Sequence, residues 1–148
     1  MEVVEVHNHL EYNCDPSSSV YVIKGAAFES FNFYKQYVDE TTYEIGMIME
    51  LQNIPNFVTH RQCEFYVYYK GENTGMTRRM DLVIDTPHGT FVVELKVLNA
   101  IDDKQRRQLW SYMKLMNCHY GMLLNFSPTG VYSETWSMNL YTHEFLRV

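Results

Sequence analysis

Residues 91–97, "FVVELKV", interrupt an apolar run with a carboxylate and an ammonium two positions apart. A short run rich in valine and leucine is typical of a buried strand. Side chains alternate between the two faces of a strand, so Glu94 and Lys96 share one face while Val93 and Leu95 share the other. Because burying an unpaired charge is unfavourable or shifts its pKa, both charged residues need either partners or a function.

The preceding strand, "RRMDLVI" at residues 78–84, has its own interruption at Asp81. A turn centred on Pro87 and His88 places Asp81 opposite Glu94, with β carbons about 5 Å apart. Two carboxylates at that separation repel each other unless a proton or a cation lies between them. The pair therefore suits a divalent cation such as Mg²⁺, which takes one or two carboxylates, several waters and a phosphate oxygen.

The role of Lys96 has two interpretations that the residues alone leave open. Beside a bound ion, its ammonium can orient or deprotonate a water and stabilise charge on phosphorus. Alternatively, Lys96 forms a salt bridge with Glu94 or Asp81 on a partly wet sheet face. The following stretch, "QLWSYMKL", adds Gln108 and Tyr112 four residues apart, hence on one helical face. They either reach the acidic site or belong to a mixed surface stripe.

The remaining patterns predict an α+β fold with a mixed central sheet flanked by helices. The element order is α, β-meander, α, β. Helical spacing predicts helices over 24–37, from Asp39 to before Pro55, and from Asp102 or Asp103 to Leu115. Strands are predicted over 57–69, 76–85, 90–97, 121–126 and 136–141, with turns at 70–75 and 85–89. The stretch "DPSSS" is a loop, so we expect an N-terminal extension over 1–19 and one domain over 20–148.

Length and composition limit the class of protein. The 148 residues are 46% hydrophobic, enough for one buried core. No apolar run is long enough to span a membrane and no signal peptide is recognisable, so we expect a soluble intracellular protein without membrane contact. Three widely spaced cysteines suit a reducing compartment.

The net charge argues against a protein that coats nucleic acid by bulk electrostatics. It is −6, from 12 Lys plus Arg against 18 Asp plus Glu. Any nucleic-acid contact must therefore be local. The candidate contacts are Arg78, Arg79, Lys104 and Arg107, although such residues, judged alone, are more often solvated surface.

The order of these motifs resembles that of the PD-(D/E)XK nuclease superfamily. Asp81, then "ELK" from Glu94, then "QLWSY" from Gln108 match its acidic residues, its lysine and the Gln-x-x-x-Tyr element of its RecB-like members. More closely, the chain resembles the GxxExxY branch, with Glu40 and Tyr43 on the Glu-x-x-Tyr positions. The similarity runs over about residues 25–126, most of the chain.

The resemblance implies a restriction-endonuclease-like αβββαβ core and hydrolysis of phosphodiester bonds with Mg²⁺ or Mn²⁺. It implies a nucleic-acid substrate, DNA in the first place with RNA as the alternative. The implied metal ligands are Asp81, Glu94, the Leu95 carbonyl and Glu40, the last either on the metal or behind its ligands. The implied catalytic lysine is Lys96, with Gln108 and Tyr112 orienting ligands or substrate.

One departure from the family pattern concerns glycine. Lys35 and Tyr37 stand where the family has glycine before the Glu-x-x-Tyr element. Glycine permits positive φ, so we expect the backbone ahead of the second helix, and the placing of Glu40, to differ from that pattern.

Two other classes of function were weighed. A non-catalytic binding module on the same scaffold would keep the sheet but act by association. A regulatory nucleotide-binding protein would need a glycine-rich phosphate loop, which the sequence lacks. Small nucleases often use a second subunit to span a duplex, so we also expect that a homodimer is feasible.

Overall fold

A computed structural model describes residues 15–148, so the first fourteen residues of the expected extension lie outside the described part. The elements follow the order α, α, β-meander, α, β. The helices are α1 Ser17–Tyr34, α2 Glu40–Leu51 and α3 Asp103–Met116. The strands are β1 Val58–Tyr69, β2 Glu72–Thr86, β3 Gly89–Lys96, β4 Tyr120–Ser127, β5 Gly130–Met138 and β6 Phe145–Arg147.

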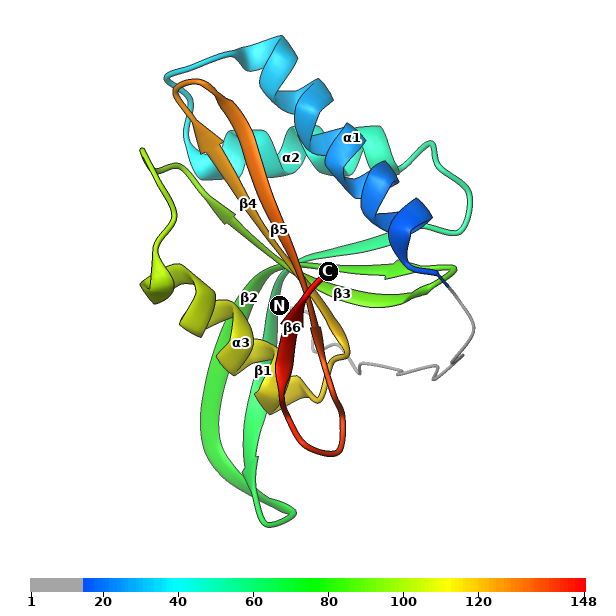
Figure 1. The fold of residues 1–148 in the computed structure, drawn as a ribbon, viewed down its shortest axis with the longest axis vertical. Coiled ribbons are helices and arrows are strands. Elements are labelled where there is room, and N and C mark those ends of the chain that lie inside the picture. The colour runs from blue at the N-terminus through cyan, green and yellow to red at the C-terminus, as the bar shows by residue number, and fades with distance from the viewer. Residues whose placement is uncertain (1–14) are drawn as a thin grey trace.

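Six strands form one sheet in the order of the sequence, from β1 to β6. Among the strands of residues 15–148, β3 and β4 are the one parallel pair, and α3 connects them, as a crossover between parallel strands requires. The sheet is strongly twisted, with α1 and α2 on one face and α3 on the other (Figure 1). This mixed α+β arrangement is the predicted restriction-endonuclease-like fold.

The core has two parts, one on each face of the sheet. Val93 and Leu95 belong to the cluster under α1 and α2. Val92 and Leu123 belong to the cluster under α3. The predicted alternation along β3 is therefore confirmed, and the face that carries Glu94 is the one that α3 covers.

The two helices that lead to the site begin where the sequence predicts. The Asp39 carboxylate accepts the backbone N–H of Thr42 at 2.9 Å and caps α2. Asp102 caps α3 in a capping box with Gln105. These caps satisfy N–H groups that a helix start leaves without partners.

Several element boundaries differ from the prediction, among them the end of α1, which is Tyr34 and not Tyr37. Helix α1 begins at Ser17, not Lys24, because Asp15 accepts the Ser17 N–H and the buried Ser19 hydroxyl bonds His88. The turn between β1 and β2 is only Lys70-Gly71, both with positive φ as a two-residue hairpin turn demands, so residues 72–75 are strand. The strand predicted over 136–141 is wrong in both bounds: β5 runs from Gly130 to Met138, and residues 139–141 belong to a turn.

Candidate active site

The acidic pair lies where β2 and β3 stop pairing. Their ladder runs from Thr86 and Gly89 to Leu82 and Val93, which confirms the predicted register. At the next pair, Asp81 and Glu94, the side-chain carboxylates accept hydrogen bonds from backbone N–H groups of the opposite strand. The Asp81 N–H donates to Glu94 Oε1 at 3.2 Å, and the Leu95 N–H donates to Asp81 Oδ2 at 3.0 Å. Each carboxylate is thus held by the backbone of the opposite strand.

The site concentrates negative charge away from water. Glu94 is 2% exposed. Burial, and then the neighbouring Asp81 carboxylate, raise the pKa of Glu94 well above its usual range. Glu40, at the start of α2, is drawn into the same site: burial and the Asp81 carboxylate raise its pKa to about 7, against the opposing charge of Lys96. A cation placed among these carboxylates would relieve their repulsion.

The donor set fits a hard divalent cation. Oxygen ligands are what Mg²⁺ and Mn²⁺ prefer, and Mg²⁺ needs only one or two carboxylates because it keeps several waters. Within residues 15–148 no group of three acidic, histidine or cysteine side chains is arranged to hold a metal. An ion at this site would be shared by two carboxylates, Asp81 and Glu94, with Glu40 nearby, and would take its other ligands from water and substrate.

Lys96 extends from the end of β3 toward α3. Its Nζ donates to Gln108 Oε1 at 2.7 Å, and Gln108 Nε2 donates in turn to the Tyr112 hydroxyl at 3.4 Å. The helical spacing of Gln108 and Tyr112 thus brings both to the acidic site. The Tyr112 ring also meets Phe65 of β1 edge-on, with ring centroids 6.1 Å apart.

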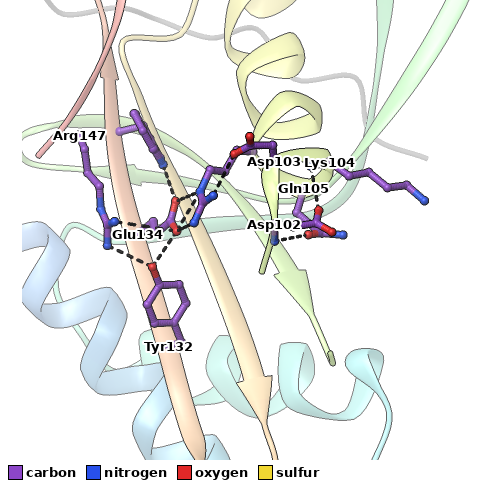
Figure 2. Close-up of polar contacts among 9 residues, drawn as sticks. Asp102, Asp103, Lys104, Gln105, Tyr132, Glu134 and Arg147 are labelled. Carbon is purple, nitrogen blue, oxygen red and sulfur yellow. Dashed lines mark hydrogen bonds and ion pairs between the residues drawn. The ribbon is translucent and has the colours of Figure 1, made fainter. Parts of the chain in front are cut away.

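A buried ion pair fixes the N-terminal half of α3, the helix that carries Gln108 and Tyr112. The Glu134 side chain on β5 is fully buried and accepts two close bonds from Arg106, at 2.9 and 2.6 Å. The Tyr132 hydroxyl and Trp136 Nε1 donate to the same carboxylate, and Arg147 approaches it (Figure 2). The Arg106 hydrogen bonds lower the pKa of Glu134 to about 2. The helix is therefore tied to the sheet close to its first turn.

Sequence reasoning missed a second buried carboxylate beside the site. Glu44 lies one helical turn after Glu40 and is 1% exposed. It accepts Arg61 Nε at 2.8 Å and Gln62 Nε2 at 3.1 Å, which joins α2 to β1. Gln62 has positive φ and stands between the two residues of β1 that pair with Leu82 and Met80, hence beside Asp81. The four-residue spacing of the two glutamates was the available signal.

The four basic residues predicted to touch nucleic acid are all exposed. Arg78 and Arg79 lie on β2, shortly before Asp81. Burial raises the pKa of Tyr112, and the positive charge of Arg78 acts in the opposite direction. Lys104 and Arg107 lie in the first half of α3. Two basic pairs therefore stand on the two elements that also carry site residues.

The expected difference between the family pattern and the backbone ahead of α2 stays a prediction, but the structure shows the conformation of the two residues concerned. Lys35 has φ 59° and Tyr37 has φ 76°, so the backbone keeps conformations that glycine adopts freely. The buried Tyr43 hydroxyl donates to the Lys35 carbonyl and holds this loop in place. Packing therefore holds Lys35 and Tyr37 in backbone conformations that are strained for residues other than glycine.

The mixed sheet with its flanking helices has a restriction-endonuclease-like arrangement. The family model of the PD-(D/E)XK nuclease superfamily matches residues 17–136, so the chain belongs to this superfamily. The crystal structure of SSO0001 is similar at 12% identity with a TM-score of 0.49, covering 84% of this chain and 81% of that chain. No curated protein matches the sequence. No helix within residues 15–148 is long and apolar enough to cross a membrane.

Proposed function

We propose that the protein is a Mg²⁺- or Mn²⁺-dependent nuclease of the GxxExxY branch that hydrolyses phosphodiester bonds, in the first place those of DNA. The observation that carries the proposal is the acidic pair at the point where β2 and β3 separate. Asp81 and Glu94 are held by each other's strands and Glu94 is buried, an arrangement that is unfavourable unless a cation or a proton lies between the carboxylates. Membership in a superfamily of nucleases supports the same chemistry.

Each residue of the site has a proposed role in hydrolysis. Asp81 and Glu94 hold the ion, with the Leu95 carbonyl and Glu40 as further ligands. A bound divalent ion supplies Lewis acidity and neutralises charge on the phosphate. Lys96 stabilises the negative charge that develops on phosphorus, because Gln108 fixes its ammonium at a defined place beside the carboxylates. Tyr112 fixes Gln108 and orients the substrate.

The substrate contacts follow from the exposed basic residues. Arg78 and Arg79 would bind phosphates on the β2 side of the site, and Lys104 and Arg107 on the α3 side. With a net charge of −6, such contacts stay local. We further propose one domain over 20–148 after the extension 1–19, an intracellular location, and a homodimer on duplex substrates.

Cleavage assays test the proposal. Labelled single-stranded, double-stranded and branched DNA, and RNA, are incubated with Mn²⁺, Mg²⁺ or EDTA. We expect cleavage with either metal, none in EDTA, and none with Asp81→Asn. Lys114→Ala is the matched control, because Lys114 is exposed at the far end of α3. Absence of cleavage on every substrate by folded wild-type protein would reject the nuclease in favour of a non-catalytic binding module.

A further inference from the structure

Three connections surround a cavity at the end of β3. The α1–α2 loop, the segment after β3 and the β4–β5 turn lie at the same end of the molecule (Figure 1). The cavity between them measures about 380 Å³, within the range of roughly 300–1,000 Å³ in which small ligands bind. Its walls include Tyr37, Val38, Leu98, Asn99 and Pro128.

Side chains fix all three walls. The buried Asn125 holds Leu98 at both backbone groups: its Oδ1 accepts the Leu98 N–H and its Nδ2 donates to the Leu98 carbonyl, each at 2.9 Å. The Gln36 side chain donates to the Pro128 carbonyl and so ties the α1–α2 loop to the β4–β5 turn. The Tyr43 hydroxyl fixes the same loop at Lys35. A cavity with such walls is preformed, which reduces the ordering that binding requires.

The lining suits a flat, partly apolar ligand with a polar edge. Val38, Leu98 and Pro128 supply apolar walls. The Tyr37 ring is 98% exposed, although its residue is held at positive φ, a conformation that is strained for a large side chain. The Asn99 amide is exposed and makes no side-chain hydrogen bond within residues 15–148. An aromatic face and an unused amide are what a nucleobase needs for stacking and for hydrogen bonding at its edge.

The cavity lies directly beside the candidate active site along the chain. Val97, which follows Lys96, and Val38, two residues before Glu40, both line it. Tyr37 also borders an adjacent hollow of about 350 Å³ that Lys35 lines. The cavity thus adjoins two elements that carry site residues, β3 and α2, which motivates placing in it a base next to the cut, with Lys35 available to another phosphate.

We propose that this cavity binds one unstacked base of the nucleic-acid strand being cut, with Tyr37 stacking on the base and Asn99 bonding its edge. The inference rests on the proposed nuclease function and adds a substrate preference to it. A base inside a duplex is already stacked and paired, so it must be extruded before it can enter. Single strands, flaps and frayed ends are therefore cut faster than continuous duplex.

Abasic scanning tests the proposal. Single-stranded DNA oligonucleotides, each lacking one base at a successive position, are cut with Mn²⁺ by wild type, Tyr37→Ala, Asn99→Ala and the control Tyr21→Ala. Tyr21 is 79% exposed on α1, outside this cavity. For wild type we expect one position next to the cut at which base removal lowers kcat/KM about tenfold or more.

The variants connect that position to the cavity. Tyr37→Ala lowers kcat/KM on the intact strand by a similar factor and shows no further loss on the abasic strand, while Tyr21→Ala behaves as wild type. In Asn99→Ala, removing the base at the same position lowers kcat/KM by a smaller factor than in wild type. The base pocket is rejected, while the proposed nuclease function stands, if wild type cuts all abasic strands at the same rate. The same holds if Tyr37→Ala shows the same dependence on the abasic position as wild type. Failure of wild type to cut any strand rejects the proposed function itself.

Discussion

Asp81 and Glu94 accept hydrogen bonds from backbone N–H groups of the opposite strand, just beyond Leu82 and Val93, the last paired residues of β2 and β3. The sequence predicts that the two residues lie opposite each other, because alternation and turn position fix register. It does not predict that the strands separate there, since hydrogen bonds between a side chain and a distant backbone leave no local pattern. Glu44 was missed for the same reason: its partner Arg61 comes from β1, and only the spacing to Glu40 pointed to it.

The backbone strain at Lys35 predicts how a substitution there changes the stability of the protein. Its φ of 59° and ψ of −142° belong to a region that is nearly restricted to glycine. Lys35→Gly is therefore expected to raise the free energy of unfolding by about 1 kcal/mol, relief of strain outweighing the greater entropy of the unfolded chain. Lys24→Gly in the interior of α1 is the control and should lower it by about 1 kcal/mol. Urea denaturation measures both. Equal losses in the two variants would contradict the strain.

Among the elements, α3 links the sheet to the site. Its boundaries are predictable from sequence because Asp102 caps it and Asn117 ends it in the left-handed conformation. The ion pair of Arg106 with Glu134, which attaches α3 to β5, is not predictable from sequence, because no local pattern connects two residues 28 positions apart. The start of α1 was misplaced because Pro and Ser favour loops but are also tolerated in a first helical turn.

Close packing of α3 on β4 is tested at Gly121. A Cβ at this residue would lie 2.5 Å from Met113 Sδ and 3.1 Å from Leu109 Cδ1, both in buried side chains. Gly121→Ala should therefore lower the free energy of unfolding by about 1 to 3 kcal/mol. Gly25→Ala is the matched control: it meets nothing within 4 Å in α1 and should raise stability by about 0.5 to 1 kcal/mol. Thermal unfolding compares them, and a gain in both variants would show that α3 packs more loosely than described.

Across the whole molecule, the Glu134 ion pair joins α3 to β5 and, through Arg147, approaches β6. The folded pKa of Glu134 is about 2, below its ordinary value of 4.5. Because the folded pKa is lower than the unfolded one, ionised Glu134 stabilises the folded protein at pH values above 4.5. This stabilisation is lost as the pH falls from 4.5 toward 2 and the carboxylate takes up a proton. The ion pair therefore stabilises the connection at neutral pH and weakens it in acid.

The variant Glu134→Gln tests this linkage. At neutral pH it should lose about 1 to 3 kcal/mol, because Arg106 loses its charged hydrogen bonds to Glu134 and keeps only the exposed Asp103 as an ion-pair partner. Its unfolding free energy should fall less steeply than that of wild type between about pH 5 and pH 2, since the titrating group is gone. Denaturation at a series of pH values measures the slopes. Parallel curves for the two proteins would show that Glu134 does not carry the linkage.

The central claim is that the acidic pair and Lys96 form a hydrolytic site, and single-turnover cleavage of labelled DNA with Mn²⁺ tests it most directly. Wild type is compared with Lys96→Ala and with Lys114→Ala, which removes an exposed lysine from the far end of α3. The account predicts that Lys96→Ala slows the cleavage step about 100-fold or more while the control keeps the wild-type rate. Equal rates in all three proteins would contradict it.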